Sequence, residues 1–180
     1  MRIKTLLANG AALLLAAPVL AGCSSDELKR EFTVPEALCG VAVPADALGR
    51  LLPASGKELK VEQDGGYVEG TGLCAVWVDS DQVMLVSNER IPAQRSAYGV
   101  MFRRAHVSGQ ESDQDKDIVY TASVSLSLVK CRGTGVQEED ISTFIETFKP
   151  GRPDESAMKE LMTGYKAALE KQQPCHKRYS

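Results

Sequence analysis

Residues 118–128 (IVYTASVSLSL) decide the fold, because apolar and small polar side chains alternate through the whole stretch. One side carries an apolar residue at every second position from Ile118 to Leu128. The other side includes Ser123, Ser125 and Ser127. A period of two predicts one long β-strand with its apolar side on a core and its serine-lined side in water, as in an antiparallel sheet covered on one face.

The segments on either side of this strand predict more strands and three helices. Strands are expected at 59–62, 73–78, 83–86 and 142–148, and the turn signals at 64–66 and 79–81 lie between the first three. Helices are expected at 44–52, at 95–106 and from Asp154 to just before Pro174, from apolar spacing and end signals. The expected fold is therefore α+β, a single domain over 33–180 with helices packed on an antiparallel sheet.

The N-terminus has the pattern of a bacterial export signal. Met1 to Lys4 form a short cationic region, and a mainly apolar stretch follows to Leu20. The next residues, Ala21-Gly22-Cys23, complete a sequence that resembles the lipobox of bacterial lipoproteins, in which the cysteine becomes the first mature residue and its thiol accepts a diacylglyceryl group. The alternative is an ordinary signal peptide followed by a chance cysteine.

The lipobox predicts where the protein is located. We expect 1–22 to be removed, Cys23 to carry the lipid, and 23–32 to act as a polar tether. Two or more acyl chains, palmitate among them, give stable anchoring. The predicted location is the extracytoplasmic face of the cell membrane, with the membrane itself as the first partner.

The composition of the remaining chain excludes one class of function. After Gly22 the chain has 158 residues, with 19 Lys and Arg against 24 Asp and Glu, a formal charge of −5. A nucleic-acid-binding protein needs a basic surface that displaces counterions, so no nucleic-acid partner is expected.

Four cysteines besides Cys23 predict two disulfides: Cys39, Cys74, Cys131 and Cys175. An even number of cysteines in an exported chain is typical of structural bridges, and three pairings are open. Pairing Cys39 with Cys74 and Cys131 with Cys175 is favoured because each pair brackets a self-contained run of elements. The alternative, a redox or metal site, lacks C-x-x-C spacing, so no metal is expected.

These cysteines and their surroundings resemble a known family. Cys39-Gly40 follows a Val-Pro segment, Cys74 lies in a strand ending at Asp79, Cys131 closes a long strand, and an Ala-Met-Lys-x-Leu helix begins at Ala157. The pattern is similar to small disulfide-bonded exported lipoproteins of actinobacteria, of the Streptomyces type. The resemblance implies a fold like that of the photosystem accessory protein PsbP. It implies no activity.

Candidate chemical sites in the sequence do not complete a known pattern. Asp113, Asp115 and Asp117 have the opening spacing of a calcium loop, but Ile118 and Val124 occupy its glycine and glutamate positions. His106 is expected on the surface at a helix end. We therefore predict no catalytic residue, no metal, no cofactor and no enzymatic activity; an envelope enzyme is the minor alternative.

The expected function is a non-catalytic binding domain at the cell envelope. One hypothesis is a pocket for a small apolar or amphipathic ligand. The other is a protein-interaction module that docks an envelope partner through the serine-lined face or through 98–105. The single tryptophan, Trp77, is expected to pack in the core rather than to stack on a ligand.

Overall fold

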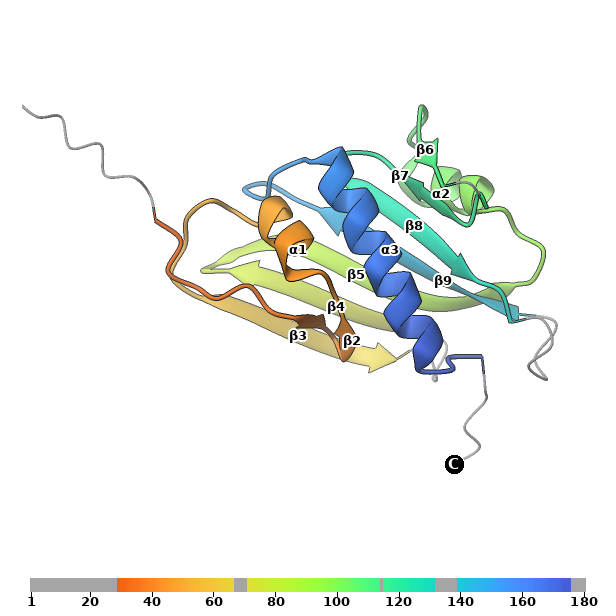
Figure 1. The fold of residues 1–180 in the computed structure, drawn as a ribbon, viewed down its shortest axis with the longest axis horizontal. Coiled ribbons are helices and arrows are strands. Elements are labelled where there is room, and N and C mark those ends of the chain that lie inside the picture. Colours follow the sequence, from red (N-terminus) through yellow and green to blue (C-terminus); the bar gives the residue numbers. More distant parts are fainter. Residues whose placement is uncertain (1–28, 67–70, 114, 132–138, 176–180) are drawn as a thin grey trace, which may run out of the picture.

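The computed structural model describes residues 29–66, 71–113, 115–131 and 139–175. Its elements, in chain order, are β1 (Ala37–Leu38), β2 (Val41–Ala42), α1 (Ala45–Leu51), β3 (Leu59–Gly66), β4 (Thr71–Val78), β5 (Asp81–Pro92), α2 (Ala97–Ala105), β6 (Glu111–Ser112), β7 (Ile118–Tyr120), β8 (Val124–Val129), β9 (Glu139–Thr147) and α3 (Glu155–Lys171). The predicted α+β class is confirmed, since helices pack on an antiparallel sheet (Figure 1).

The large sheet has seven strands in the order β3-β4-β5-β9-β8-β7-β6, and every neighbouring pair is antiparallel. The strand β5 extends well beyond the predicted 83–86, whereas β9 begins at Glu139, before the predicted 142–148, and ends at Thr147. β1 and β2 form a separate small hairpin beside the sheet.

One face of the sheet is covered by α1 and α3, which lie against each other (Figure 1). Asp154 begins α3 as its N-cap and accepts a hydrogen bond from the Ala157 backbone N–H at 2.9 Å. The buried stripe of α3 is the predicted one: Met158, Leu161, Met162, Tyr165 and Leu169. Gly164 permits the close approach to Pro44, because an added Cβ would lie 2.4 Å from the Pro44 Cγ.

The opposite face of the sheet is only partly covered. α2 contacts β7 and β8 there, and its buried Val100 and Met101 pack with Val119, Leu126 and Leu128. On the same side of β3 and β4, the described part of the chain places no helix, and Leu73 keeps 43% of its surface exposed. We call this uncovered side of β3, β4 and the start of β5 the open face.

The predicted long strand over 118–128 is instead two strands joined by a tight turn. Val124 and Ser123 donate their backbone N–H groups to the Thr121 hydroxyl, and the Thr121 N–H donates to the Val124 carbonyl at 2.8 Å. β7 and β8 then pair, with Tyr120 opposite Ser125. A threonine hydroxyl that accepts backbone N–H groups stabilises a turn without interrupting an alternating pattern. The alternation of residue types therefore gave no indication that the chain reverses direction here.

The serine-lined side is buried, contrary to the prediction of a wet face. Ser125 and Ser127 are both fully buried under α3, and the Ser125 hydroxyl lies 3.1 Å from the Met158 sulfur. The apolar side of β8 meets α2 instead. A sheet face is solvent-exposed only if no other element covers it. Here helices from distant parts of the sequence cover both sides of the strand, so neither side faces water.

A buried polar network accompanies these serines beneath α3. The Asn88 side-chain amide donates to the Tyr165 hydroxyl at 2.9 Å, and the Thr143 hydroxyl donates to the Asn88 side-chain oxygen at 2.7 Å. These hydrogen bonds compensate the burial of the Asn88, Thr143 and Tyr165 polar groups under the principal helix.

Both favoured disulfides are present. Cys39–Cys74 joins the β1–β2 hairpin to β4, with a Cα–Cα distance of 6.0 Å, and Cys131–Cys175 joins the segment after β8 to the segment after α3, at 5.3 Å. Each lies within the usual range for a disulfide.

The folded part begins earlier than the predicted boundary at residue 33. The Arg30 guanidinium donates to the carbonyls of Gly49 and Pro53, and Phe32 is 9% exposed. The last residues of the predicted tether are thus packed on the domain. None of the helices in the described segments is long and apolar enough to cross a membrane.

Candidate functional site

The open face presents an apolar strip with a charged border. Because side chains alternate along β4, burial of Cys74, Val76 and Val78 turns Leu73, Ala75 and Trp77 to the other side. The strand register places charged residues on β3 and an apolar residue on β5 beside them: Lys60 next to Trp77, Glu62 next to Ala75, Asp64 next to Leu73, and Leu85 next to Ala75. Glu62, Gln63, Asp64, Leu73 and Ala75 line a shallow hollow at this border.

Trp77 is not the core residue that was predicted. Its side chain is half-buried on the open face, and its indole nitrogen has no hydrogen-bond partner among the described residues. The physical reason is that only the inner side of β4 faces α1 and α3, while no helix of the described segments covers its outer side.

Arg104 marks the boundary between α2 and the open face. Its guanidinium bonds to the Ser87 hydroxyl at 2.7 Å, pairs with Glu89 at 3.2 Å and lies over the Phe144 ring at 4.9 Å from the centroid. Burial raises the pKa of the nearby Glu146 carboxyl, and the charge of Arg104 opposes that rise. The border between α2 and the open face is therefore polar, and its side chains are held by hydrogen bonds, an ion pair and a cation–π contact.

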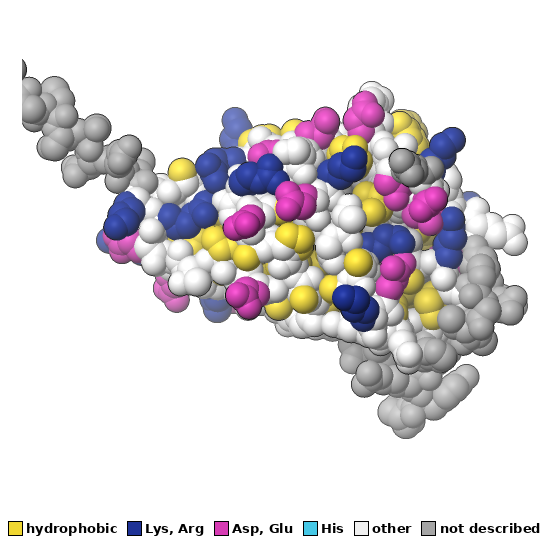
Figure 2. All heavy atoms as spheres, in the orientation of Figure 1, with side chains coloured by type: hydrophobic (Ala, Val, Ile, Leu, Met, Phe, Trp, Pro, Cys, Tyr) yellow, Lys and Arg dark blue, Asp and Glu magenta, His cyan; other side chains and the backbone are white. Residues whose placement is uncertain are grey.

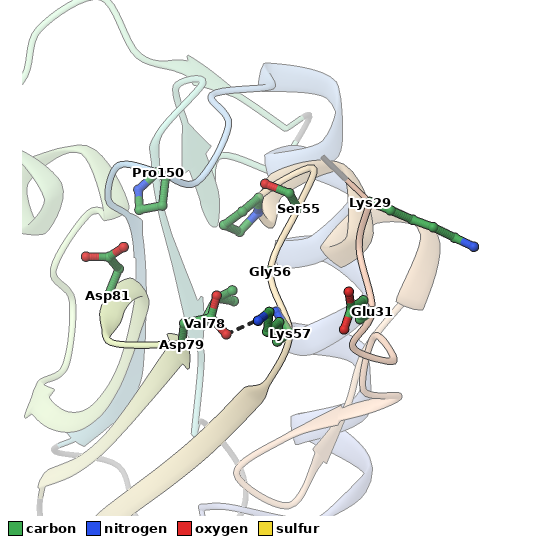
Figure 3. A pocket seen from close by; sticks show the side chains of 10 residues that line it. Lys29, Glu31, Ser55, Gly56, Lys57, Val78, Asp79, Asp81 and Pro150 are labelled. Carbon is green, nitrogen blue, oxygen red and sulfur yellow. Dashed lines mark hydrogen bonds between the residues drawn. The ribbon is translucent and has the colours of Figure 1, made fainter. Parts of the chain in front are cut away.

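A second concave site, the end pocket, lies where the described chain begins (Figure 3). Its volume is about 470 Å³, and it is lined by Lys29, Glu31, Pro53, Ser55, Gly56, Lys57, Val78, Asp79, Asp81 and Pro150. Pro53 and Val78 are buried and supply apolar walls, while the charged side chains are exposed.

The backbone of the end pocket is held by close contacts. The Asp79 carboxylate accepts the backbone N–H groups of Lys57 and Glu58, both at 3.0 Å. Gly56 has a φ of +140°, and an added Cβ there would lie 2.4 Å from a Val78 methyl group. Only glycine combines that backbone conformation with so close an approach.

Four charged side chains of the end pocket have no ion-pair or hydrogen-bond partner within the described segments: Lys29, Glu31, Lys57 and Asp81. Lys29 and Asp81 stand on opposite sides, and the Lys29 side chain points outward (Figure 3). The pocket thus offers unpaired charges of both signs to a ligand.

The structure uses most of the predicted site residues for stability. The four cysteines form the two bridges, and Cys23 lies outside the described residues. Asp113 accepts the Ile118 N–H at 3.0 Å, and Asp117 pairs with Lys130 at 2.6 Å. His106 is the C-cap of α2. In the described segments, no group of three or more His, Cys, Asp and Glu residues is arranged to hold a metal ion.

The sequence patterns did not predict the open face or the end pocket. Alternate positions 73, 75 and 77 could have indicated the open face, if only one side of the strand had been expected to be covered. The end pocket combines four separate segments of the chain and has no continuous sequence signal.

No family model, curated protein or solved structure matches this chain. The fold and its bridges define a disulfide-bonded α+β domain. The likeness to exported actinobacterial lipoproteins, and the PsbP-like architecture it implies, stay predictions.

Proposed function

We propose that this chain is a lipid-anchored, non-catalytic binding domain on the extracytoplasmic face of the cell membrane. The lipobox ending at Cys23 supports the anchor. The two disulfides support an oxidising compartment, because such bonds persist mainly in exported proteins.

The open face carries the binding part of this proposal. Leu73 is exposed, and Ala75, Trp77 and Leu85 are partly exposed, although side chains of this kind are buried elsewhere in the sheet. A small apolar ligand binds in a concave site that encloses most of its surface, whereas this face is a flat strip between charged borders. Apolar and aromatic residues at the centre with a polar rim are typical of protein interfaces. We therefore assign the open face to a protein partner of the envelope.

Site-specific photo-cross-linking in the living cell tests this proposal. A photoreactive amino acid at Leu73 in the full chain should give one discrete protein adduct. Trp77→Ala should remove the adduct, and circular dichroism should show that the domain of this variant stays folded at the temperature of the experiment. The matched control carries the photoreactive amino acid in place of Thr163, which is exposed on α3 at the other face of the sheet.

Two results would contradict the proposal. Equal adducts from positions 73 and 163 would show that cross-linking is not specific to the open face. Absence of an adduct at position 73 would show that the open face has no protein partner in the cell. Cell fractionation tests the anchor separately: Cys23→Ala should move the protein from the membrane to the soluble fraction, and retention in the membrane would exclude anchoring through Cys23.

A further inference from the structure

The end pocket lies at the end of the domain that a lipid on Cys23 would hold near the membrane. The described chain enters the domain at Lys29, six residues after Cys23. A fully extended chain spans at most about 3.6 Å per residue, so the distance from Cys23 to Lys29 is no more than about 22 Å. Glu31 then bonds through its N–H to the Gly56 carbonyl at 2.8 Å, and because both residues line the end pocket, the pocket lies at this same end.

The charge distribution favours the same orientation. The segments that form this end, 29–32, 49–58, 79–81 and 148–155, contain six Lys and Arg and six Asp and Glu residues. The formal charge of −5 of the chain after Gly22 therefore belongs to the remainder: −2 to Asp26 and Glu27, which precede Lys29, and −3 to the rest of the domain. Since bacterial membranes carry anionic lipids, the neutral end can approach them with less repulsion than the acidic remainder. Figure 2 shows Lys and Arg mixed with Asp and Glu next to the N-terminal trace.

The chemistry of the pocket indicates the kind of ligand. Lys57 has no acidic partner in the described segments and can meet an anion. Asp81 is likewise unpaired, and Asp79 uses one carboxylate oxygen for two backbone N–H groups. The buried Val78 and Pro53 supply apolar contact. A ligand that fits these walls carries one anionic group, such as a phosphate, and one cationic group, such as an ammonium.

We propose that the end pocket binds the head group of an aminophospholipid of the phosphoethanolamine type, with the phosphate at Lys57 and the ammonium group at Asp79 and Asp81. The inference rests on the proposed lipid anchor for the orientation of the domain. The binding chemistry itself can be measured without the anchor.

The first arm of the test uses the Cys23→Ala chain in solution with glycerophosphoethanolamine, the water-soluble head group. We expect saturable binding by NMR titration, with at least a tenfold loss of affinity in each of Lys57→Gln and Asp81→Asn. Lys60→Gln, an exposed lysine on β3, is the matched control and should bind as the parent does. Inorganic phosphate should bind at least tenfold more weakly, because it lacks the ammonium group.

The second arm uses the lipidated chain in vesicles. Vesicles of phosphatidylethanolamine should slow hydrogen exchange in 53–58 and 79–81 relative to vesicles of phosphatidylglycerol. Absence of saturable binding in the first arm, equal binding by all variants, or equal affinity for phosphate would overturn the proposal. Binding in solution without protection in vesicles would overturn the proposal too, because the ligand of the pocket would then be a free phosphodiester and not a membrane lipid. Failure of these arms while Cys23→Ala still releases the protein from membranes leaves the proposed anchor intact.

Discussion

Ser127 is a fully buried residue beneath α3 whose hydroxyl has no hydrogen-bond partner among the described residues. An unpaired buried hydroxyl costs about 1–3 kcal/mol. Its neighbour Ser125, two positions earlier on the same side, contacts the Met158 sulfur. The two serines are equivalent in sequence pattern and differ only in what α3 places above them.

We expect Ser127→Ala to raise the free energy of unfolding by about 1 kcal/mol, because it removes an unpaired polar group and leaves only a small void. Ser125→Ala is the matched control and should be neutral or slightly destabilising, since it removes a contact. Urea unfolding at pH 7 measures both. A loss of stability in Ser127→Ala, equal to that in Ser125→Ala, would show that the Ser127 hydroxyl is bonded.

The helix α3 is the element on which the covered face depends, and Asp154 determines where it begins. Hydrogen bonds from the backbone N–H of Ala157 and from the Ser156 hydroxyl hold the pKa of the Asp154 carboxyl below its usual range. Arg50 adds an ion pair at 3.4 Å. The charged form is thus preferred in the folded state, and the cap ties α3 to α1 as well as satisfying a free helix N–H.

Asp154→Ala should lower the free energy of unfolding by about 1 kcal/mol at pH 7. Because folding depresses this pKa, the charge contributes its stabilisation above the unfolded-state pKa of about 3.9. That contribution is lost as the pH falls through the lower folded-state pKa. Melting curves of the two proteins should therefore converge in acid. Asp154→Asn keeps a capping oxygen and should retain most of the stability at pH 7; a difference between wild type and Asp154→Ala that is constant down to pH 2 would contradict the charge argument.

At the scale of the whole molecule, the two bridges connect its peripheral segments to the sheet. Cys39 and Cys74 are separated by 35 residues in sequence, and Cys131 and Cys175 by 44. Cys131–Cys175 joins the sheet to the end of α3, so it limits how far the helix can separate from the strands in the unfolded chain.

Replacing Cys131 and Cys175 together by serine should lower the free energy of unfolding by about 4 kcal/mol in the chain-entropy model. The Cys39→Ser/Cys74→Ser pair, with a slightly shorter loop, should lose a similar amount. Urea unfolding of both double variants measures this, and mass spectrometry of the parent should show a mass four hydrogens below that of the reduced chain. Unchanged stability in the Cys131/Cys175 pair would contradict a stabilising role for this bridge.

The sequence by itself determined the helices, most of the long strands and the class of fold. Apolar spacing and capping residues predicted the three helices of the described segments, including the buried stripe of α3 from Met158 to Leu169. The even cysteine count and the bracketing of elements favoured the two disulfides that the structure contains. These features depend on interactions within one segment or on the number of cysteines, so a single sequence carries them.

Only the tertiary structure decided which layer covers each side of a strand. The period of two in 118–128 indicates which side chains share a side of a strand. It does not show that the chain turns at Thr121 or that α3 buries Ser125 and Ser127. The same limit applies to Trp77, which is half-buried because no described helix covers that side of β4. The end pocket likewise joins loops around residues 56, 79 and 150. Burial depends on elements that are distant in sequence, and this is the physical reason why local patterns could not show it.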